Sequence, residues 1–75
     1  MKEKIYEYSK NFAVNLKAER LAKHFTQKQM AEKMNIKTQS YQAYECNISM
    51  PTAENLLKIV EILNISLDEL FEIKK

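Results

Sequence analysis

Apolar residues recur along this chain every three or four positions, the spacing that places them on one face of an α-helix. The first such stripe consists of Ile5, Tyr8, Phe12 and Leu16. It predicts a helix that begins near Lys4 and ends at about Lys23. Ser9 is a second candidate for the start, because serine is a good N-cap. In that alternative, residues 1–8 form an arm.

Later helices carry start signals of the same kind. Thr26 with Gln29, and Ser66 with Glu69, have the spacing of a capping box, and Thr52 is a third candidate N-cap. Together with the apolar pattern, these signals predict further helices at residues 27–34, 38–46, 53–63 and 67–72. Asn35, Asn47 and Asn64 stand where glycine often ends a helix, and asparagine tolerates the left-handed backbone required there.

The apolar faces of these helices predict one hydrophobic core. We expect it to contain Phe12, Leu16, Phe25, Met30, Met34, Ile36, Tyr41, Leu56, Ile59, Val60, Leu63, Leu67 and Leu70. Leu57 belongs to the same wide apolar face of the helix at 53–63. Five helices with short connections predict an all-α fold in a single domain.

The composition excludes several classes of protein. The 75 residues include no glycine and one proline, which argues against an all-β fold and against a glycine-rich phosphate loop. One cysteine and one histidine cannot form a disulfide framework and are too few for a metalloenzyme site. No apolar run reaches the roughly 18 residues of a membrane span, and the N-terminus does not resemble a signal peptide. A lone thiol and the lack of an export signal together predict a cytoplasmic protein.

Charge is distributed unevenly along the chain. Residues 1–37 hold nine Lys/Arg and four Asp/Glu, whereas residues 38–75 hold three and six. The basic half is therefore the one that suits a polyanion. Arg20 is the only arginine among twelve basic residues. Its planar guanidinium can pair with a carboxylate through two hydrogen bonds, which a lysine cannot do.

The helices predicted at 27–34 and 38–46 are joined by about four residues, which is typical of a helix-turn-helix. The motifs T-Q-x-x-M-A at 26–31 and I-S-L-D-E-L at 65–70 add specificity, together with Tyr44-Glu45 and Pro51-Thr52. In these residues the chain resembles the lambda-repressor-like helix-turn-helix family, the phage repressor and Cro group also called XRE. The resemblance covers about residues 12–71.

The resemblance implies a compact five-helix DNA-binding domain whose second short helix lies in the major groove. It assigns Gln27 to a DNA phosphate, a buried ion pair to Arg20 and Glu45, and base contacts to Thr38, Gln39 and Ala43. By the same resemblance, Ser40 and Gln42 are expected to contact the DNA backbone or its phosphates. The residues expected at the DNA are Gln27, Lys28, Lys37, Thr38, Gln39, Ser40, Gln42 and Ala43.

The chain departs from the family pattern at the start of the second short helix. Lys37 stands where serine or threonine usually caps it. Thr38 is then an alternative cap, which would move the helix start by one residue and remove Thr38 from the bases. In that case Lys37 is placed to reach a phosphate.

The sequence therefore predicts a sequence-specific regulator of transcription, in the first place a small repressor that binds double-stranded DNA. We expect no catalytic activity, cofactor, metal or small-molecule ligand. Residues 1–10 are expected to extend the first helix or form an arm, residues 11–72 to form the DNA-binding domain, and residues 73–75 to form a tail. Two alternatives share the fold: the antitoxin of a toxin–antitoxin pair, and a protein-interaction module that no longer binds DNA.

We also expect a homodimer, because one recognition helix reads too few base pairs for selectivity in a genome. The acidic C-terminal end is the candidate interface, with Phe71 and Ile73 left over beyond the predicted core. In the alternative, Phe71 folds back onto the first helix, against Ile5 or Tyr8.

Overall fold

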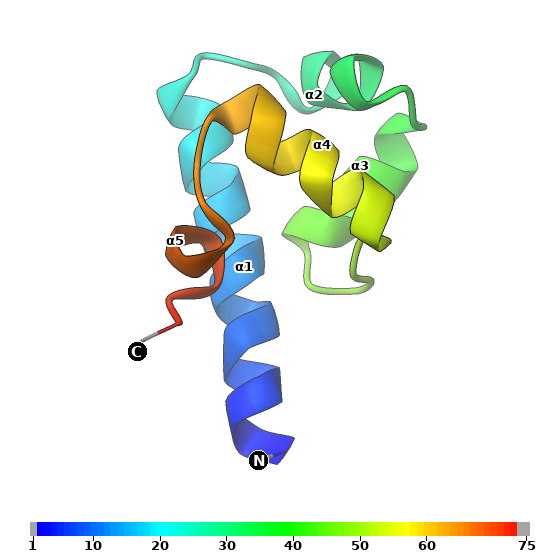
Figure 1. The fold of residues 1–75 in the computed structure, drawn as a ribbon. Helices are drawn as coiled ribbons and strands as arrows, with labels where there is room; N and C mark the ends of the chain where they lie inside the picture. The colour runs from blue at the N-terminus through cyan, green and yellow to red at the C-terminus, as the bar shows by residue number, and fades with distance from the viewer. Residues whose placement is uncertain (1, 74–75) are drawn as a thin grey trace.

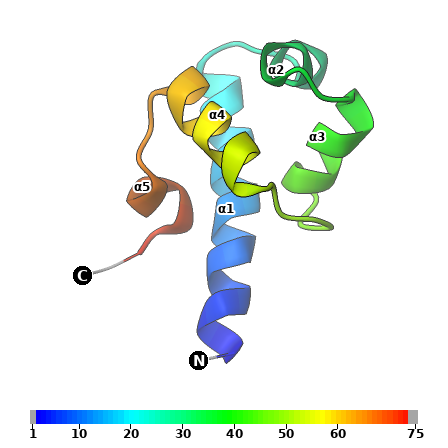
Figure 2. The same ribbon diagram turned by 45° about the vertical axis from the view of Figure 1, so that its right-hand side comes forward.

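The computed structural model describes residues 2–73, and within them it has five helices and no strand. They are α1 (Lys2–Ala22), α2 (Gln27–Met34), α3 (Thr38–Glu45), α4 (Ala53–Leu63) and α5 (Leu67–Phe71). The predicted all-α fold is confirmed. The long helix α1 packs against α3 and α5, which lie on opposite sides of it in both views (Figures 1 and 2). The first turns of α1 extend beyond the other helices (Figure 1).

The start of α1 differs from one of the two predicted alternatives. The helix begins at Lys2, so residues 2–10 are helical, and the prediction of an arm is wrong. Ser9 lies inside the helix, where its hydroxyl is 3.2 Å from the carbonyl oxygen of Tyr6 and 3.2 Å from Oδ1 of Asn47. Ile5 is 61% exposed because the first turns extend beyond the body that would cover it.

Thr26, Thr52 and Ser66 cap their helices as predicted. Thr26 and Ser66 each form a complete capping box, and the Thr52 hydroxyl accepts a hydrogen bond from the backbone N–H of Asn55 at 3.2 Å. These bonds satisfy N–H groups that have no partner within their own helix. Among residues 2–73, left-handed backbone occurs at the three predicted asparagines and at two further positions: His24, Asn35, Asn47, Asn64 and Glu72.

The core lies where α1, α2, α3, α4 and α5 meet. Its fully buried side chains are Phe12, Leu16, Met30, Met34, Tyr41, Ile59, Leu63 and Leu70. One core prediction is wrong, because Leu67 is 37% exposed. Leu57, which was placed on the wide apolar face of the helix at 53–63, is 62% exposed. Leu57 lies two residues, about 200° round the helix, from the buried Ile59. Leu67 is the first residue of the short helix α5, whose buried residue is Leu70.

Helix α5 packs against α1 through an aromatic stack and through hydrogen bonds from two asparagine side chains of α1. The rings of Phe71 and Phe12 stack with their centroids 5.0 Å apart. Nδ2 of Asn15 donates to the carbonyl of Leu70 at 2.9 Å, and Nδ2 of Asn11 donates to that of Phe71 at 3.4 Å. These amides occupy carbonyls that a helix C-terminus leaves without a partner. The prediction that Phe71 is left uncovered is therefore wrong, and the alternative, in which Phe71 folds back onto the first helix, is confirmed by its stack on Phe12.

Candidate nucleic-acid interface

Helices α2 and α3 are joined by the three residues Asn35, Ile36 and Lys37. Asn35 is left-handed, with φ 57° and ψ 46°, and its N–H still bonds to the last turn of α2. The N–H of Ile36 donates to the carbonyl of Ala31 at 3.0 Å, and Lys37 is extended. The tight turn keeps α2 and α3 packed against each other as a helix-turn-helix.

Lys37 is the N-cap of α3, and Thr38 is its first helical residue. The alternative in which Thr38 caps the helix is therefore wrong. In the part of the chain that the structure describes, no side chain provides a capping hydrogen bond at this end. Thr38 thus stays on the helix at the register that the family resemblance assigns to it.

The two sides of α3 differ in chemistry. Tyr41 and Tyr44 are buried against the rest of the molecule. The other side carries short hydroxyl and amide side chains, of which Gln39, Ser40 and Gln42 are exposed. The residues predicted to contact DNA divide into five exposed ones and three half-buried ones: Lys28, Lys37, Gln39, Ser40 and Gln42, then Gln27, Thr38 and Ala43. All eight lie on α2, on α3 or at the turn between them.

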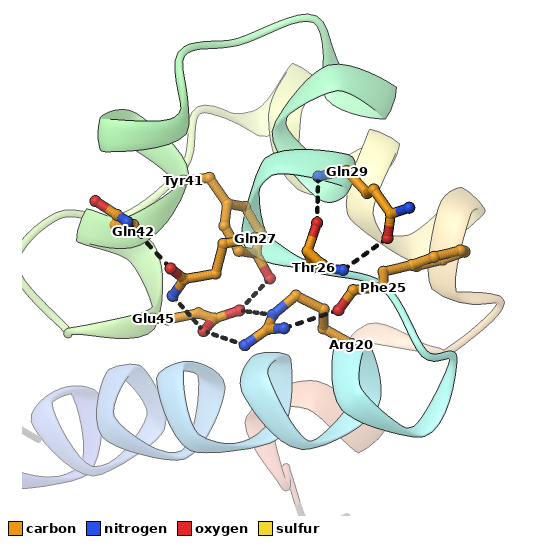
Figure 3. A network of polar contacts seen from close by, with 8 residues as sticks. All are labelled: Arg20, Phe25, Thr26, Gln27, Gln29, Tyr41, Gln42 and Glu45. Atoms are coloured by element: carbon orange, nitrogen blue, oxygen red, sulfur yellow. Dashed lines mark hydrogen bonds and ion pairs between the residues drawn. The ribbon is translucent and has the colours of Figure 1, made fainter.

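An ion pair holds α3 against α1, as the family resemblance implies (Figure 3). Nε of Arg20 lies 2.6 Å from Oε2 of Glu45, and Nη2 lies 3.1 Å from Oε1. Nη1 donates to the carbonyl oxygen of Phe25 at 2.8 Å. The two charged side chains are only 7% and 3% exposed. This two-pronged geometry is the one that an arginine provides and a lysine does not.

Glu45 also accepts hydrogen bonds from two uncharged side chains. They are the hydroxyl of Tyr41, one turn earlier on α3, and Nε2 of Gln27, at 3.1 Å. Burial alone would raise the pKa of the Glu45 carboxyl, but the hydrogen bonds from Arg20, Tyr41 and Gln27 hold this pKa below its usual value. The carboxylate is therefore ionised at neutral pH, with donors from α1, α2 and α3 directed at it.

Burial raises the pKa of the Tyr41 phenol, and its hydrogen bond to Glu45 raises it further. The hydrogen bond with Glu45 also raises the pKa of Arg20, against the opposing effect of burial. Both groups therefore remain protonated donors at neutral pH.

Sequence reasoning did not foresee two parts of this network. Tyr41 was expected only to fill the apolar core, and Gln27 was expected only to contact a DNA phosphate. The spacing of Tyr41 and Glu45, four residues apart on one helix, was a signal for the first contact. The second contact depends on how α2 crosses α3, which local patterns do not specify. Oε1 of Gln27 also accepts from Nε2 of Gln42 at 3.1 Å.

Two further findings concern other kinds of site. Among residues 2–73, no cluster of three or more His, Cys, Asp or Glu side chains is arranged to hold a metal ion. Within the same residues, no helix is both long enough and apolar enough to cross a membrane.

The fold and the α2–α3 geometry define a helix-turn-helix protein. A family model described as "Helix-turn-helix" matches residues 16–70, and the chain belongs to this family. The match covers the last third of α1, all of α2, α3 and α4, and almost all of α5.

Two curated proteins are similar in sequence. The cryptic phage CTXphi transcriptional repressor RstR of Vibrio cholerae is 48% identical over 52 residues, which cover 69% of this chain and 46% of that protein. The uncharacterized HTH-type transcriptional regulator YqaE of Bacillus subtilis is 41% identical over 61 residues, 81% of this chain and 53% of that protein. The chain thus spans about half the length of the curated relatives that it matches. No solved structure matches the chain.

Proposed function

We propose that this chain binds double-stranded DNA of a defined sequence and regulates transcription, in the first place as a repressor. The observation that carries the proposal is the outer face of α3. It is polar, uncharged and exposed at Gln39, Ser40 and Gln42. The opposite face is buried against the core through Tyr41 and Tyr44. The relative RstR is named a transcriptional repressor. The protein would act in the cytoplasm by occupying DNA, without catalysis.

The chemistry of α3 suits the edges of bases. A glutamine amide can pair with N6 and N7 of adenine in the major groove, and the methyl of Ala43 can meet the methyl of thymine. Thr38 and Gln39 lie in the first turn of α3, from which recognition helices contact bases. A rigid helix presents these groups at small entropic cost, because the Arg20–Glu45 pair already holds it in place.

The turn and the start of α2 supply groups for phosphates. Lys28 near the start of α2 and Lys37 in the turn are exposed cations. Gln27 has an amide N–H beyond the one that it donates to Glu45. Contacts of this kind fix the register of a protein on the duplex without reading its sequence.

The proposal is tested by selecting bound duplexes from a random pool. We expect wild-type protein to enrich one sequence. We expect Gln39→Ala to lose preference at one base pair by roughly 5- to 150-fold, because a good amide–base contact is worth about 1–3 kcal/mol. Lys28→Ala is the matched control and should weaken binding to all duplexes alike. A pool that stays unenriched after repeated rounds would contradict the proposal.

We also propose a homodimer formed through the α5 end of the molecule. Leu67 and Ile73 are apolar and more than a third exposed there, at 37% and 39%. Because α5 and α3 lie on opposite sides of α1, two copies joined at α5 would leave both recognition helices free (Figure 2). A twofold dimer reads two half-sites about 34 Å apart.

Sedimentation equilibrium tests the dimer. Phe71 is a poor position for a substitution, because its ring stacks on Phe12 inside the domain. We therefore expect Leu67→Ser with Ile73→Ser to shift the protein toward monomer, while far-UV circular dichroism shows that its helices remain folded. Leu57→Ser, at an exposed leucine on α4, is the control and should leave the mass unchanged. A wild-type chain that stays monomeric at high micromolar concentration would rule out this interface.

A further inference from the structure

A line of hydrogen-bonded side chains connects the buried ion pair with the outer surface of α3. Oε1 of Glu45 accepts from Nη2 of Arg20 and from Nε2 of Gln27, each at 3.1 Å. Oε1 of Gln27 then accepts from Nε2 of Gln42, also at 3.1 Å. Gln42 is exposed, so the line ends at the surface (Figure 3).

The charge of Glu45 fixes the direction of every bond in this line. An ionised carboxylate can only accept hydrogen bonds, so the Gln27 amide must turn its N–H toward Glu45. The Gln27 carbonyl then faces Gln42, and Gln42 must donate. A lone surface glutamine can present its amide either way round. Gln42 cannot, because Glu45 sets its orientation through Gln27.

In this orientation Gln42 keeps two hydrogen-bonding groups for a ligand. They are its own Oε1, an acceptor, and its second N–H, a donor. An acceptor and a donor on one amide are the pair of groups that recognise N6 and N7 of adenine in the major groove. A phosphate offers only acceptors, so a contact to phosphate would gain nothing from a fixed carbonyl.

We propose that Gln42 reads an adenine in the bound DNA and that Gln27 is its positioning residue. The proposal rests on the proposed function and replaces the expectation that Gln42 contacts the DNA backbone. Holding the amide in advance removes part of the entropic cost of ordering it on the base. Gln27 thereby influences sequence preference in addition to any contact that it makes with phosphate.

A double-mutant cycle separates positioning from a phosphate contact. It uses wild-type protein, Gln27→Ala, Gln42→Ala and the double variant, with the selected duplex and single-base-pair variants of it. We expect Gln42→Ala to lose roughly 5- to 150-fold of discrimination at one A·T pair. We expect Gln27→Ala to lose discrimination at the same pair. The two losses should be non-additive by about threefold or more, as for residues in contact.

The control cycle pairs Gln27→Ala with Gln39→Ala, which changes the neighbouring exposed glutamine of α3. Its losses should multiply to within about twofold, as for independent positions. Thermal melts establish that each variant is folded at the temperature of the binding assay. Coupling of the same size in both cycles would overturn the positioning role, because it would show a general disturbance of α3.

A second variant changes the chemistry of the side chain at position 42 and keeps its length. Gln42→Glu has no N–H to donate to Gln27 and offers only acceptors, which suit the N4 amino group of cytosine. We expect the preferred base at that position to change from adenine to cytosine. A wild-type protein that selects a sequence, while Gln42→Ala and Gln42→Glu keep the same preference at every position, would overturn this inference alone. A wild-type protein without any sequence preference would overturn the proposed function, and this inference with it.

Discussion

The two helices of the helix-turn-helix begin in different ways. Helix α2 has a complete local start, in which Thr26 and Gln29 bond to each other's backbone. Helix α3 starts at Thr38, and among the described residues no side chain supplies a capping hydrogen bond at its N-cap, Lys37. Its inner face is held instead by Tyr41, Tyr44 and the pair between Glu45 and Arg20. Helix α2 thus has a local cap in addition to its buried face. Helix α3, the helix that we propose reads DNA, relies on tertiary contacts.

The difference predicts that loss of the ion pair has the largest effect. Arg20→Ala leaves the carboxylate of Glu45 buried without its counter-ion, and we expect a loss of about 3–5 kcal/mol in the free energy of unfolding. Lys17→Ala, at an exposed position of the same helix, is the control and should change it by about 0.5 kcal/mol or less. Chemical denaturation measures both. Equal stability of the two variants would mean that α3 does not depend on the pair.

Acid should weaken the same contact. Folding lowers the pKa of Glu45 below its ordinary value of 4.5, so the unfolded chain binds the proton more readily than the folded one. The stabilisation from the pair is therefore fully present above about pH 4.5 and is lost as the pH falls through the lower pKa of the folded state. Glu45→Gln should show a smaller loss of stability over this range in melts taken from pH 7 to pH 2. An identical acid profile for the two proteins would contradict the lowered pKa.

Removing the cap of α2 should have a smaller effect. Thr26→Ala deletes one hydrogen bond at the start of α2, and we expect a loss of about 1 kcal/mol in the free energy of unfolding. Thr26→Ser keeps the hydroxyl and should stay near wild type. If Thr26→Ala lowers stability as much as Arg20→Ala does, the contrast between α2, which has a local cap, and α3, which relies on tertiary contacts, is wrong.

Supplying the missing cap of α3 should have the smallest effect. Lys37→Ser restores a capping hydroxyl, and we expect a gain of roughly 0.5–1 kcal/mol in stability. The same change removes a cation beside the proposed DNA surface, so binding to every duplex should weaken. Denaturation and a binding assay on one preparation measure the two opposite changes. A variant that is no more stable than wild type would indicate that α3 needs no cap.

The sequence predicts those parts of the fold that local chemistry determines. Hydroxyls at Thr26, Thr52 and Ser66 and asparagines at the helix ends set boundaries that the structure confirms. Local patterns fail where packing decides. Leu67 has the character of a core residue and is exposed, and Phe71 was expected at the surface and stacks on Phe12.

The candidate site divides in the same way. The family resemblance indicates Arg20 and Glu45 as partners and α3 as the outward helix, because these follow from motif positions. The bonds from Gln27 to Glu45 and to Gln42 join residues 18 and 15 positions apart. They depend on the crossing of α2 and α3, which spacing along the chain does not define.

The most direct test of the central claim is the affinity of the protein for its selected duplex and for a scrambled duplex across a range of salt concentrations. Our account predicts a preference of at least about 10³-fold for the selected duplex. It also predicts a linear fall of the logarithm of affinity with the logarithm of salt concentration, as phosphate contacts require. Equal affinity for the two duplexes, or binding that salt does not weaken, would contradict the claim that α3 reads DNA.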